Sequence, residues 1–389
     1  MYRIQTLNKI SSKGLSCFPE TKYAYGDQLE NPDAILVRSA SLHEMEFGDN
    51  LKAIARAGAG VNNIPVEACA EKGIVVFNTP GANANAVKEL VLAAMLISSR
   101  KIPQAIEWVG TLKGQGDAIG KMVEKNKSRF AGPELAGKKL GVIGLGAIGV
   151  LVANAASHLG MEVYGYDPYL SVESAWHLSH SVHHAETLKE IFTECDYITV
   201  HVPLTPETKN SVDREALSMM KEGARLYNFA RDGLVDNDAV LEALASGKLA
   251  AYVTDLPTEK LIGAEGVIAV PHLGASTPES EENCASMAAA ELIDFFENGN
   301  IRHSVNFPEV VVPRETDCRV CVIHRNVPNM LSQISGVFSA MEHNIENMTN
   351  KSKNEYAYTV LDIRESDFRQ DYTEQLKKIE GVIRVRVIR

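Results

Sequence analysis

The segment that most constrains the fold of this chain is a glycine motif, Gly144-Leu145-Gly146-Ala147-Ile148-Gly149, set between a strand pattern and a helix pattern. The short apolar run before it, Lys139–Ile143, is typical of a buried strand. Helical spacing then continues to Leu159 and ends at Gly160, a residue suited to a helix C-terminus. This order predicts a strand–turn–helix unit that opens a doubly wound α/β domain.

A second strand pattern, Met161–Tyr166, ends at Asp167, about 20 residues after the first glycine. Glycines in such a turn let the backbone approach a pyrophosphate, and the N-terminus of the helix offers free N–H groups to its charge. Asp167 is placed to accept hydrogen bonds from an adenosine ribose, and its carboxylate repels a 2′-phosphate. Because Pro168 and Tyr169 supply no cation, we predict NAD as the cofactor. Its expected contacts in this unit are Gly144, Gly146, Ala147, Ile148, Gly149 and Asp167.

Further strand and helix patterns continue the alternation. Strands are predicted at 196–202, 224–229, 250–254 and 266–270, and helices at 213–221 and 238–246. In open parallel sheets, ligands bind at the carboxyl ends of strands, where Arg231, Asp255 and His272 fall. His exchanges protons near neutral pH, Arg can hold a carboxylate through two hydrogen bonds, and a carboxylate such as Glu259 can orient the imidazole. The pattern therefore predicts hydride and proton transfer at a hydroxyl-bearing carbon next to a carboxylate.

Six motifs together resemble those of the D-isomer-specific 2-hydroxyacid dehydrogenase family, across nearly all of the first 310 residues. They are Arg56–Val61, Asn78–Gly81, Gly144–Gly149, His201–Thr208, Asn228–Asp236 and Pro271–Ser276. The resemblance implies that His272 is the catalytic acid/base, Glu259 its partner, and Arg231 the ligand of the substrate's carboxylate and reacting oxygen. It also implies further cofactor contacts at Pro203, Phe229, Ala230, Arg231, Asp255, His272, Gly274 and Ala275.

The loop that carries Glu259 departs from the family pattern, in which the Glu commonly stands five positions after the Asp. Here Asp255 and Glu259 are only four positions apart. Either the loop has lost one residue, or Asp255 occupies a shifted position. We keep Asp255 as the carboxylate on the nicotinamide side and Glu259 as the partner of His272.

Two arginines upstream indicate a phosphorylated substrate. Arg38 follows a strand pattern and is followed by Ser39, and Arg56 opens a loop that contains Ala59 and Gly60. The family resemblance implies that backbone amides of this loop face the substrate carboxylate, and that the branch acting on D-3-phosphoglycerate has both arginines at its phosphate. Two arginines in one cleft repel each other unless an anion lies between them. The alternative is that each arginine is solvated or paired with an acid.

A separate unit follows a proline-containing linker at 310–316. Its predicted elements are strand 319–324, helix 330–342, strands 345–350 and 356–363, helix 372–379 and strand 383–388. This βαββαβ order resembles an ACT domain, a small module that senses amino acids. The resemblance implies His324, Asn326 and Asn344 as contacts for L-serine, although Asn329 stands where Gly is usual. The alternative is an assembly module that has lost its effector site.

Composition limits the remaining possibilities. A net charge of −11 gives the 389-residue chain no overall attraction to nucleic acid, and no apolar run reaches the 18 residues of a membrane span. Six scattered cysteines suggest reduced thiols and a cytoplasmic location. Cys318 and Cys321 fall on opposite faces of a predicted strand, and we interpret His177, His180, His183 and His184 as a surface loop and edge strand. Neither group predicts a metal site. The basic stretch 121–129 either extends the positive field around the two arginines or, as we interpret it, forms a solvated loop.

These observations predict an α/β enzyme with three domains. A flavodoxin-like substrate domain spans 1–92 and is completed by 281–309, a Rossmann domain spans 93–280, and an ACT domain spans 317–389. We expect NAD-dependent oxidation of D-3-phosphoglycerate to 3-phosphohydroxypyruvate, the first step of L-serine synthesis, in a serine-regulated homodimer or homotetramer. The alternatives are a hydroxypyruvate or glyoxylate reductase of the same family, and an NAD(H)-sensing binding protein.

Overall fold

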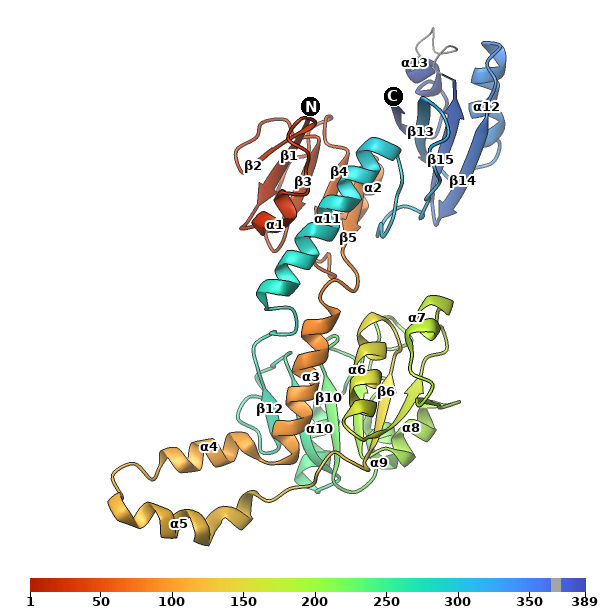
Figure 1. The fold of residues 1–389 in the computed structure, drawn as a ribbon. Helices are drawn as coiled ribbons and strands as arrows, with labels where there is room; N and C mark the ends of the chain where they lie inside the picture. The colour runs from red at the N-terminus through yellow and green to blue at the C-terminus, as the bar shows by residue number, and fades with distance from the viewer. Residues whose placement is uncertain (365–371) are drawn as a thin grey trace. The chain divides into compact units, whose positions relative to one another are not determined.

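The computed structural model describes residues 1–364 and 372–389, and the chain divides into two compact units. One unit contains residues 84–277 and the other contains 1–83 together with 278–389. The chain passes between them at 83/84 and 277/278, whereas the sequence placed these crossings at 92/93 and 280/281. The first crossing lies earlier because helix α3 (Ala84–Ser99) packs on the sheet of the central unit along its whole length. Figure 1 gives the order of the elements.

The central unit is built on a seven-stranded sheet in which all pairs are parallel, in the order β12-β11-β10-β9-β6-β7-β8. Its strands are β6 (Lys139–Ile143), β7 (Glu162–Tyr166), β8 (His183–His184), β9 (Tyr197–Val200), β10 (Ala224–Asn228), β11 (Leu249–Thr254) and β12 (Val267–Ala269). The order reverses beside β6, the strand that precedes the glycine motif. This is the Rossmann arrangement, and it confirms the predicted fold class.

Helices cover both faces of this sheet. On one face, α3 and α6 (Ala147–His158) enclose a cluster that includes Val91, Val142 and Val152. On the other face, the cluster around Ile198 and Leu226 lies under three helices: α8 (Leu188–Glu194), α9 (Arg214–Met219) and α10 (Asn237–Ala245). Helix α7 (Val172–His177) has no buried residue. Asn228 and Thr254, at the carboxyl ends of β10 and β11, are buried polar residues.

A helical arm extends from the central unit. It consists of α4 (Ile102–Gly110), a short 3-10 helix (Gly116–Ala118), α5 (Ile119–Asn126) and a second 3-10 helix (Lys127–Phe130). The sequence prediction of a loop at 121–129 is therefore wrong. Ile119, Met122 and Val123 have the spacing of one helix face, a pattern that the surrounding lysines obscured.

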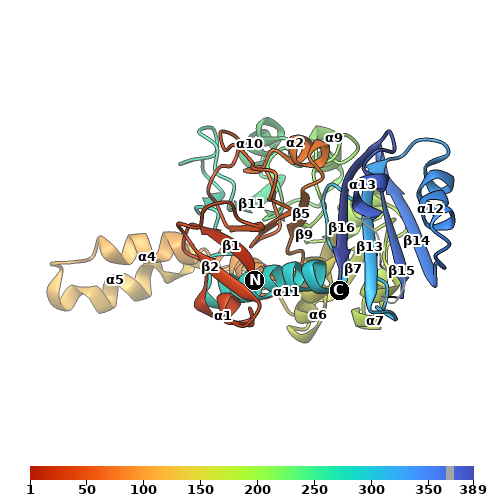
Figure 2. The ribbon, with the colours of Figure 1, turned by 90° about the horizontal axis from the view of Figure 1, so that it is seen from above.

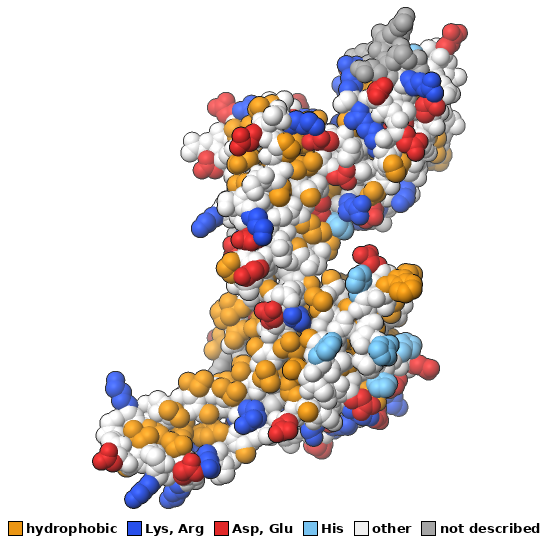
Figure 3. All heavy atoms as spheres, in the orientation of Figure 1, with side chains coloured by type: hydrophobic (Ala, Val, Ile, Leu, Met, Phe, Trp, Pro, Cys, Tyr) orange, Lys and Arg blue, Asp and Glu red, His pale blue; other side chains and the backbone are white. Residues whose placement is uncertain are grey.

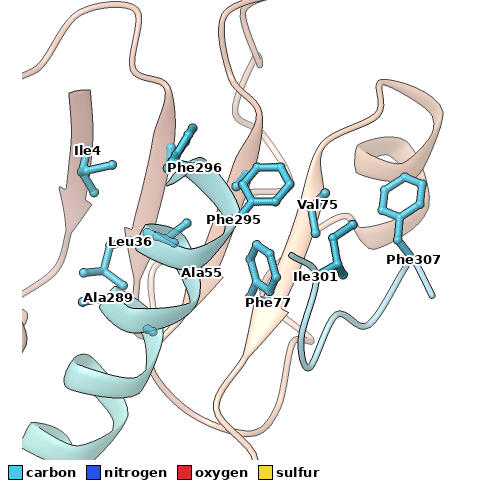
Figure 4. Close-up of a cluster of buried hydrophobic side chains, with 14 of the residues drawn as sticks. Ile4, Leu36, Ala55, Val75, Phe77, Ala289, Phe295, Phe296, Ile301 and Phe307 are labelled. Carbon is cyan, nitrogen blue, oxygen red and sulfur yellow. The ribbon is translucent and has the colours of Figure 1, made fainter. Parts of the chain in front are cut away.

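The other unit contains a five-stranded parallel sheet in the order β2-β1-β3-β4-β5. Its strands are β1 (Tyr2–Leu7), β2 (Tyr23–Gly26), β3 (Ala34–Val37), β4 (Ala53–Arg56) and β5 (Val75–Asn78). The helices with it are α1 (Ser12–Leu15), α2 (Val66–Glu71) and α11 (Pro278–Asn298). This strand order is flavodoxin-like, as predicted. Figure 4 shows Phe77, Phe295, Phe296 and Ala289 in the core between α11 and the sheet.

The C-terminal part of the same unit is a four-stranded antiparallel sheet in the order β14-β15-β13-β16. Its elements are β13 (Cys318–Arg325), α12 (Met330–Ala340), β14 (Asn347–Lys353), β15 (Tyr356–Ile363), α13 (Tyr372–Leu376) and β16 (Val382–Ile388). The βαββαβ order confirms the predicted ACT-like architecture. The predicted helix at 372–379 ends earlier, at Leu376, while residues 365–371 lie outside the described part of the chain.

The ACT-like sheet uses both of its faces. One face packs on α12 and α13 through Val320, Ile334 and Phe338. The opposite face, with Ile323 and Tyr358, joins the hydrophobic cluster of α11 and the five-stranded sheet. Figure 2 shows α12 on the side of the ACT-like sheet away from α11. The ACT-like sheet is thus packed directly against α11 and the five-stranded sheet within one unit.

Candidate active site

The glycine turn between β6 and α6 has a geometry that only glycine satisfies at two positions. Gly144 has φ of +92°, and a Cβ there would lie 2.9 Å from the carbonyl oxygen of His201. A Cβ at Gly149 would overlap the carbonyl oxygen of Gly144, so the helix could not approach the turn. By contrast, a Cβ at Gly146 would meet open space, and Ala147 beside it is exposed. The open side of the turn therefore leaves room for a pyrophosphate at the start of α6.

Asp167 lies directly after β7 and faces this turn. Its Oδ2 accepts a hydrogen bond of 2.8 Å from the backbone N–H of Leu145, and its Oδ1 accepts one of 2.9 Å from that of Tyr169. Each carboxylate oxygen keeps a further acceptor site for a ribose hydroxyl. The residues of the turn thus fit a dinucleotide. Nearby, the Pro203 carbonyl accepts a hydrogen bond of 2.6 Å from the Thr208 hydroxyl, which closes the loop after β9.

Arg231 lies in the loop that follows β10 and is exposed. Its Nη1 donates to the carbonyl of Ala230 at 2.7 Å. Asn228, which is only 2% exposed, makes two hydrogen bonds to the backbone of this loop. Its Nδ2 donates to the Arg231 carbonyl, and its Oδ1 accepts from the Ala230 N–H. Sequence reasoning treated Asn228 only as part of a motif. The structure shows that it orients the loop that carries the guanidinium, while neighbouring Phe229 packs in the core.

Asp255 fixes the loop of His272 at the ends of the adjacent strands β11 and β12. The Asp255 carbonyl accepts from the His272 N–H at 2.9 Å, and its Oδ2 accepts from the Gly274 N–H at 2.9 Å. Asp255 is 1% exposed, and its Oδ1 is buried with no hydrogen-bond partner in the described chain. In the loop that follows His272, Gly274 is buried and Ala275 is half-buried. Arg231, Asp255 and His272 thus follow three neighbouring strands of one sheet.

Glu259 makes no described hydrogen bond or ion pair with His272. It is exposed and lines an open cavity of about 470 Å³ together with Asn210, Asp232, Asp236 and Lys260. Among residues 1–364 and 372–389, no side chain makes a hydrogen bond to the His272 imidazole, which is exposed. Pairing of Glu259 with His272 therefore remains a prediction.

Arg38 and Arg56 meet at the carboxyl ends of the neighbouring strands β3 and β4. Arg56 Nε donates to the Arg38 carbonyl at 3.0 Å, and the Arg38 guanidinium forms an ion pair of 2.8 Å with Glu281 on α11. A Cβ at Gly58 would overlap the Arg56 guanidinium, so the side chain folds back over its own loop. The two arginines are close to each other, as predicted. Arg38 is also paired with an acid, which was the alternative interpretation.

Two asparagines hold the backbone around these arginines, and neither was predicted. Asn8, in a left-handed conformation with φ of +68°, accepts hydrogen bonds from the N–H groups of Ser39 and Ala40 through its Oδ1. Asn78, at the end of β5, donates from Nδ2 to the Ala59 carbonyl at 2.6 Å. Ala59 and Gly60 are half-buried, with their loop held in place from the sheet.

The three predicted effector contacts have different surroundings. His324 is 2% exposed, and its ring nitrogens lie 2.8 Å from the Arg325 carbonyl and 2.9 Å from the Thr359 hydroxyl. Burial lowers the pKa of His324. Asn326 and Asn344 are exposed and bond to the Asn354 carbonyl and to Glu346, respectively. No described contact joins the three residues.

The turn before α12 tolerates the substitution that the sequence had put in question. Asn329 adopts φ of +68° at the N-cap of the helix, a conformation that asparagine reaches more readily than most residues.

Cys318 packs on the helix side of the ACT-like sheet and Cys321 on the opposite face, as predicted. His183 and His184 form the exposed edge strand β8, also as predicted. In the described residues, no group of three or more His, Cys, Asp or Glu side chains is placed to hold a metal, and no helix is long and apolar enough to cross a membrane.

Comparison with known proteins assigns the class. Residues 92–274 match the NAD-binding domain of the D-isomer-specific 2-hydroxyacid dehydrogenases, and residues 320–384 match the ACT domain that resembles the small subunit of AHAS. A relative in Haemophilus influenzae is 35% identical over 356 residues, which are 88% of this chain and 83% of the relative. The chain therefore belongs to the D-isomer-specific 2-hydroxyacid dehydrogenase family, a family of oxidoreductases, and its predicted cofactor, NAD, is confirmed.

The relatives carry a more specific name. The protein from H. influenzae is a D-3-phosphoglycerate dehydrogenase, as is one from Methanocaldococcus jannaschii that is 38% identical over 75% of this chain. The chain spans 55% of the M. jannaschii relative and 83% of the H. influenzae relative. Among solved structures, NAD⁺-bound 3-phosphoglycerate dehydrogenase of Entamoeba histolytica is 29% identical, with a TM-score of 0.61 over 78% of this chain and 98% of its own.

Proposed function

We propose that this protein catalyses the NAD-dependent oxidation of D-3-phosphoglycerate to 3-phosphohydroxypyruvate. The observation that carries the substrate assignment is the meeting of Arg38 and Arg56 at adjacent strand ends, where Arg56 Nε donates to the Arg38 carbonyl, since two arginines at one edge of the sheet suit a phosphate dianion. The names of the relatives from M. jannaschii and H. influenzae support the same substrate. The roles that the family resemblance implies for the residues give a mechanism.

In this mechanism, Arg231 binds the substrate's carboxylate and the oxygen at C2, and the backbone of Ala59 and Gly60 faces the same carboxylate. Neutral His272 removes the C2 hydroxyl proton, and a carboxylate, which we assign to Glu259, stabilises the imidazolium that forms. The glycine turn after β6 and Asp167 would hold NAD, which would supply the hydride acceptor for C2. Asp255 keeps the His272 loop in place through its two backbone contacts. Closure of the loop after Asp255 would bring Glu259 to the imidazole.

A specific observation favours a second candidate. The Arg38–Glu281 ion pair neutralises one of the two arginines, as would suit a reductase of glyoxylate or hydroxypyruvate that binds no phosphate. A substrate panel separates the two proposals. Formation of NADH should be fastest with D-3-phosphoglycerate and much slower with D-glycerate and D-lactate. Arg38→Ala and Arg56→Ala should raise KM for the phosphorylated acid far more than for the others. Equal effects on all three acids would rule out a phosphate site.

We also propose that L-serine inhibits the enzyme through the ACT-like domain and that the protein is a homo-oligomer. The ACT family match supports an amino-acid effector. The arm supports assembly, because Ile102, Ile106, Val109 and Ile119 are exposed on it, and Figure 3 shows hydrophobic side chains gathered there. Millimolar L-serine should slow turnover, and His324→Ala should relieve the inhibition. Light scattering of the full chain should give a dimer or tetramer, and a monomer would refute assembly through the arm.

A further inference from the structure

The Arg38 guanidinium forms an ion pair with a carboxylate of this chain, that of Glu281. Its Nη1 lies 2.8 Å from Oε1 of Glu281, a residue in the first turn of α11, so the ion pair joins the end of β3 to that helix. Arg56 lies next to it through the 3.0 Å hydrogen bond from its Nε to the Arg38 carbonyl. Glu281 thus supplies a carboxylate to the Arg38 guanidinium.

Both side chains of this ion pair are reachable from solvent. The side chains of Arg38 and Glu281 are 37% and 41% exposed. An exposed ion pair is weak and exchanges readily. A phosphate ester carries a charge between −1.5 and −2 at neutral pH and has three acceptor oxygens, so it competes well against one carboxylate for the same guanidinium.

We propose that Glu281 occupies Arg38 in the absence of substrate and competes with the substrate's phosphate, so that it sets the affinity of the site for phosphorylated acids. This inference rests on the proposed function, because it takes Arg38 as the phosphate ligand. Unphosphorylated acids do not engage Arg38, and their binding is insensitive to Glu281. Glu281 is therefore a specificity-determining residue that touches neither the reacting carbon nor the cofactor.

The position of Glu281 adds a consequence. The chain passes from the central unit into the other unit at Thr277–Pro278, and Glu281 follows within the first turn of α11. When phosphate displaces Glu281 from Arg38, this turn loses its tie to β3. Occupation of the phosphate site is thereby linked to the segment that connects the two units.

Glu281→Gln tests the proposal, and Glu282→Gln is the matched control. Glu282 is the next residue on the same helix and pairs with Lys13 at 2.9 Å, away from Arg38. Glu281→Gln should lower KM for D-3-phosphoglycerate and the inhibition constant of inorganic phosphate about three- to tenfold, the size expected for loss of a competing exposed ion pair and its charge. KM for D-glycerate should change less than about twofold by the same reasoning. Glu282→Gln should change none of these constants.

A second readout separates this proposal from the proposed function. Inorganic phosphate should raise the Tm of the NADH-saturated Glu281→Gln protein at lower concentration than it does for the parent. If the parent does not oxidise D-3-phosphoglycerate but this shift occurs, the function fails and the competition stands. If the parent is active and Glu281→Gln binds phosphate and substrate no better than the parent, the competition is refuted. Glu281→Asp, which keeps the charge on a shorter side chain, should give intermediate constants and covers the case in which the Gln variant folds poorly.

Discussion

Replacing Arg319 by Met should lower the free energy of unfolding of the unit that contains the ACT-like domain. Arg319 is fully buried on β13, and each of its five N–H groups has an acceptor. Two of them reach the carboxylate of Asp362 at 2.6 and 2.8 Å. The other three reach the carbonyls of Asn298, Val312 and Pro313, at the end of α11 and in the linker. One side chain therefore joins the ACT-like sheet, the linker and the helix.

The size of the effect follows from what the substitution leaves behind. Met fills a similar volume but leaves the Asp362 carboxylate, only 1% exposed, without its counter-ion. Breaking a buried ion pair by removing one partner costs about 3–5 kcal/mol. In a unit of about 200 residues, each kcal/mol shifts Tm by about 2–4 °C. The transition of the unit that contains Arg319 should therefore fall by about 6–20 °C.

Differential scanning calorimetry of the full chain measures this change, with NADH added to mark the transition of the cofactor unit. Arg325→Met is the matched control, since Arg325 lies on the same strand but pairs with Glu355 at 3.3 Å with 38% and 79% exposure. That variant should lose no more than about 1 kcal/mol. Trypsin should also cut the linker at 310–317 faster in Arg319→Met. A loss of stability no larger than that of the control would refute the reasoning, because Asp362 would then not depend on Arg319.

Two further predictions concern the cofactor turn and a buried carboxylate. Gly149→Ala should weaken NADH binding more than about tenfold, because the added Cβ would overlap the Gly144 carbonyl. The control is Gly120→Ala on the exposed arm, where the Cβ would meet open space; it should leave NADH binding unchanged and stabilise α5 slightly. Fluorescence titration with NADH measures both affinities, and similar affinities for the two variants would contradict the packing argument. Burial raises the pKa of Glu291 from 4.5 to about 9 and outweighs the opposing effect of Arg302; His303 Nδ1 lies 2.8 Å from its Oε1. The folded protein therefore retains a proton on Glu291 that the unfolded chain loses. Stability should fall as pH rises from about 5 to 9. Glu291→Gln should flatten this dependence in Tm measurements across that range, and a variant with the same pH slope as the parent would refute the assignment.

Local patterns in the sequence predicted the elements that position the site. The glycine motif, its flanking apolar runs and Asp167 form one strand–turn–helix–strand unit, and such a unit is decided by residues close together in the chain. The sites after β10, β11 and β12 were predictable for a related reason. Parallel strands must end at one edge of the sheet, so Arg231, Asp255 and His272 could be grouped without knowledge of their contacts.

What the sequence could not predict are pairings between residues distant in the chain. Arg38 meets Glu281 only because α11 returns to the five-stranded sheet after the whole central unit. Asn8, which holds the Ser39 loop, is an ordinary loop residue in the sequence, and its left-handed conformation appears only in the fold. Asp255 and Glu259 are four positions apart, and this spacing alone does not fix the position of the Glu259 side chain.

Helix α11 joins the two features on which these proposals depend. At its C-terminal end, the Asn298 carbonyl accepts from Arg319 of the ACT-like sheet, and Arg386 lies 3.8 Å over the ring of Phe295. At its first turn, Glu281 holds Arg38. Its 21 residues span about 30 Å as a single rigid element. Arg319 joins the ACT-like sheet to the C-terminal end of this helix, so we expect an effector bound to the sheet to bias the Arg38–Glu281 pair. Arg319→Met should then weaken the proposed inhibition by serine at temperatures where the variant stays folded. Unchanged inhibition would show that the signal does not pass through this contact.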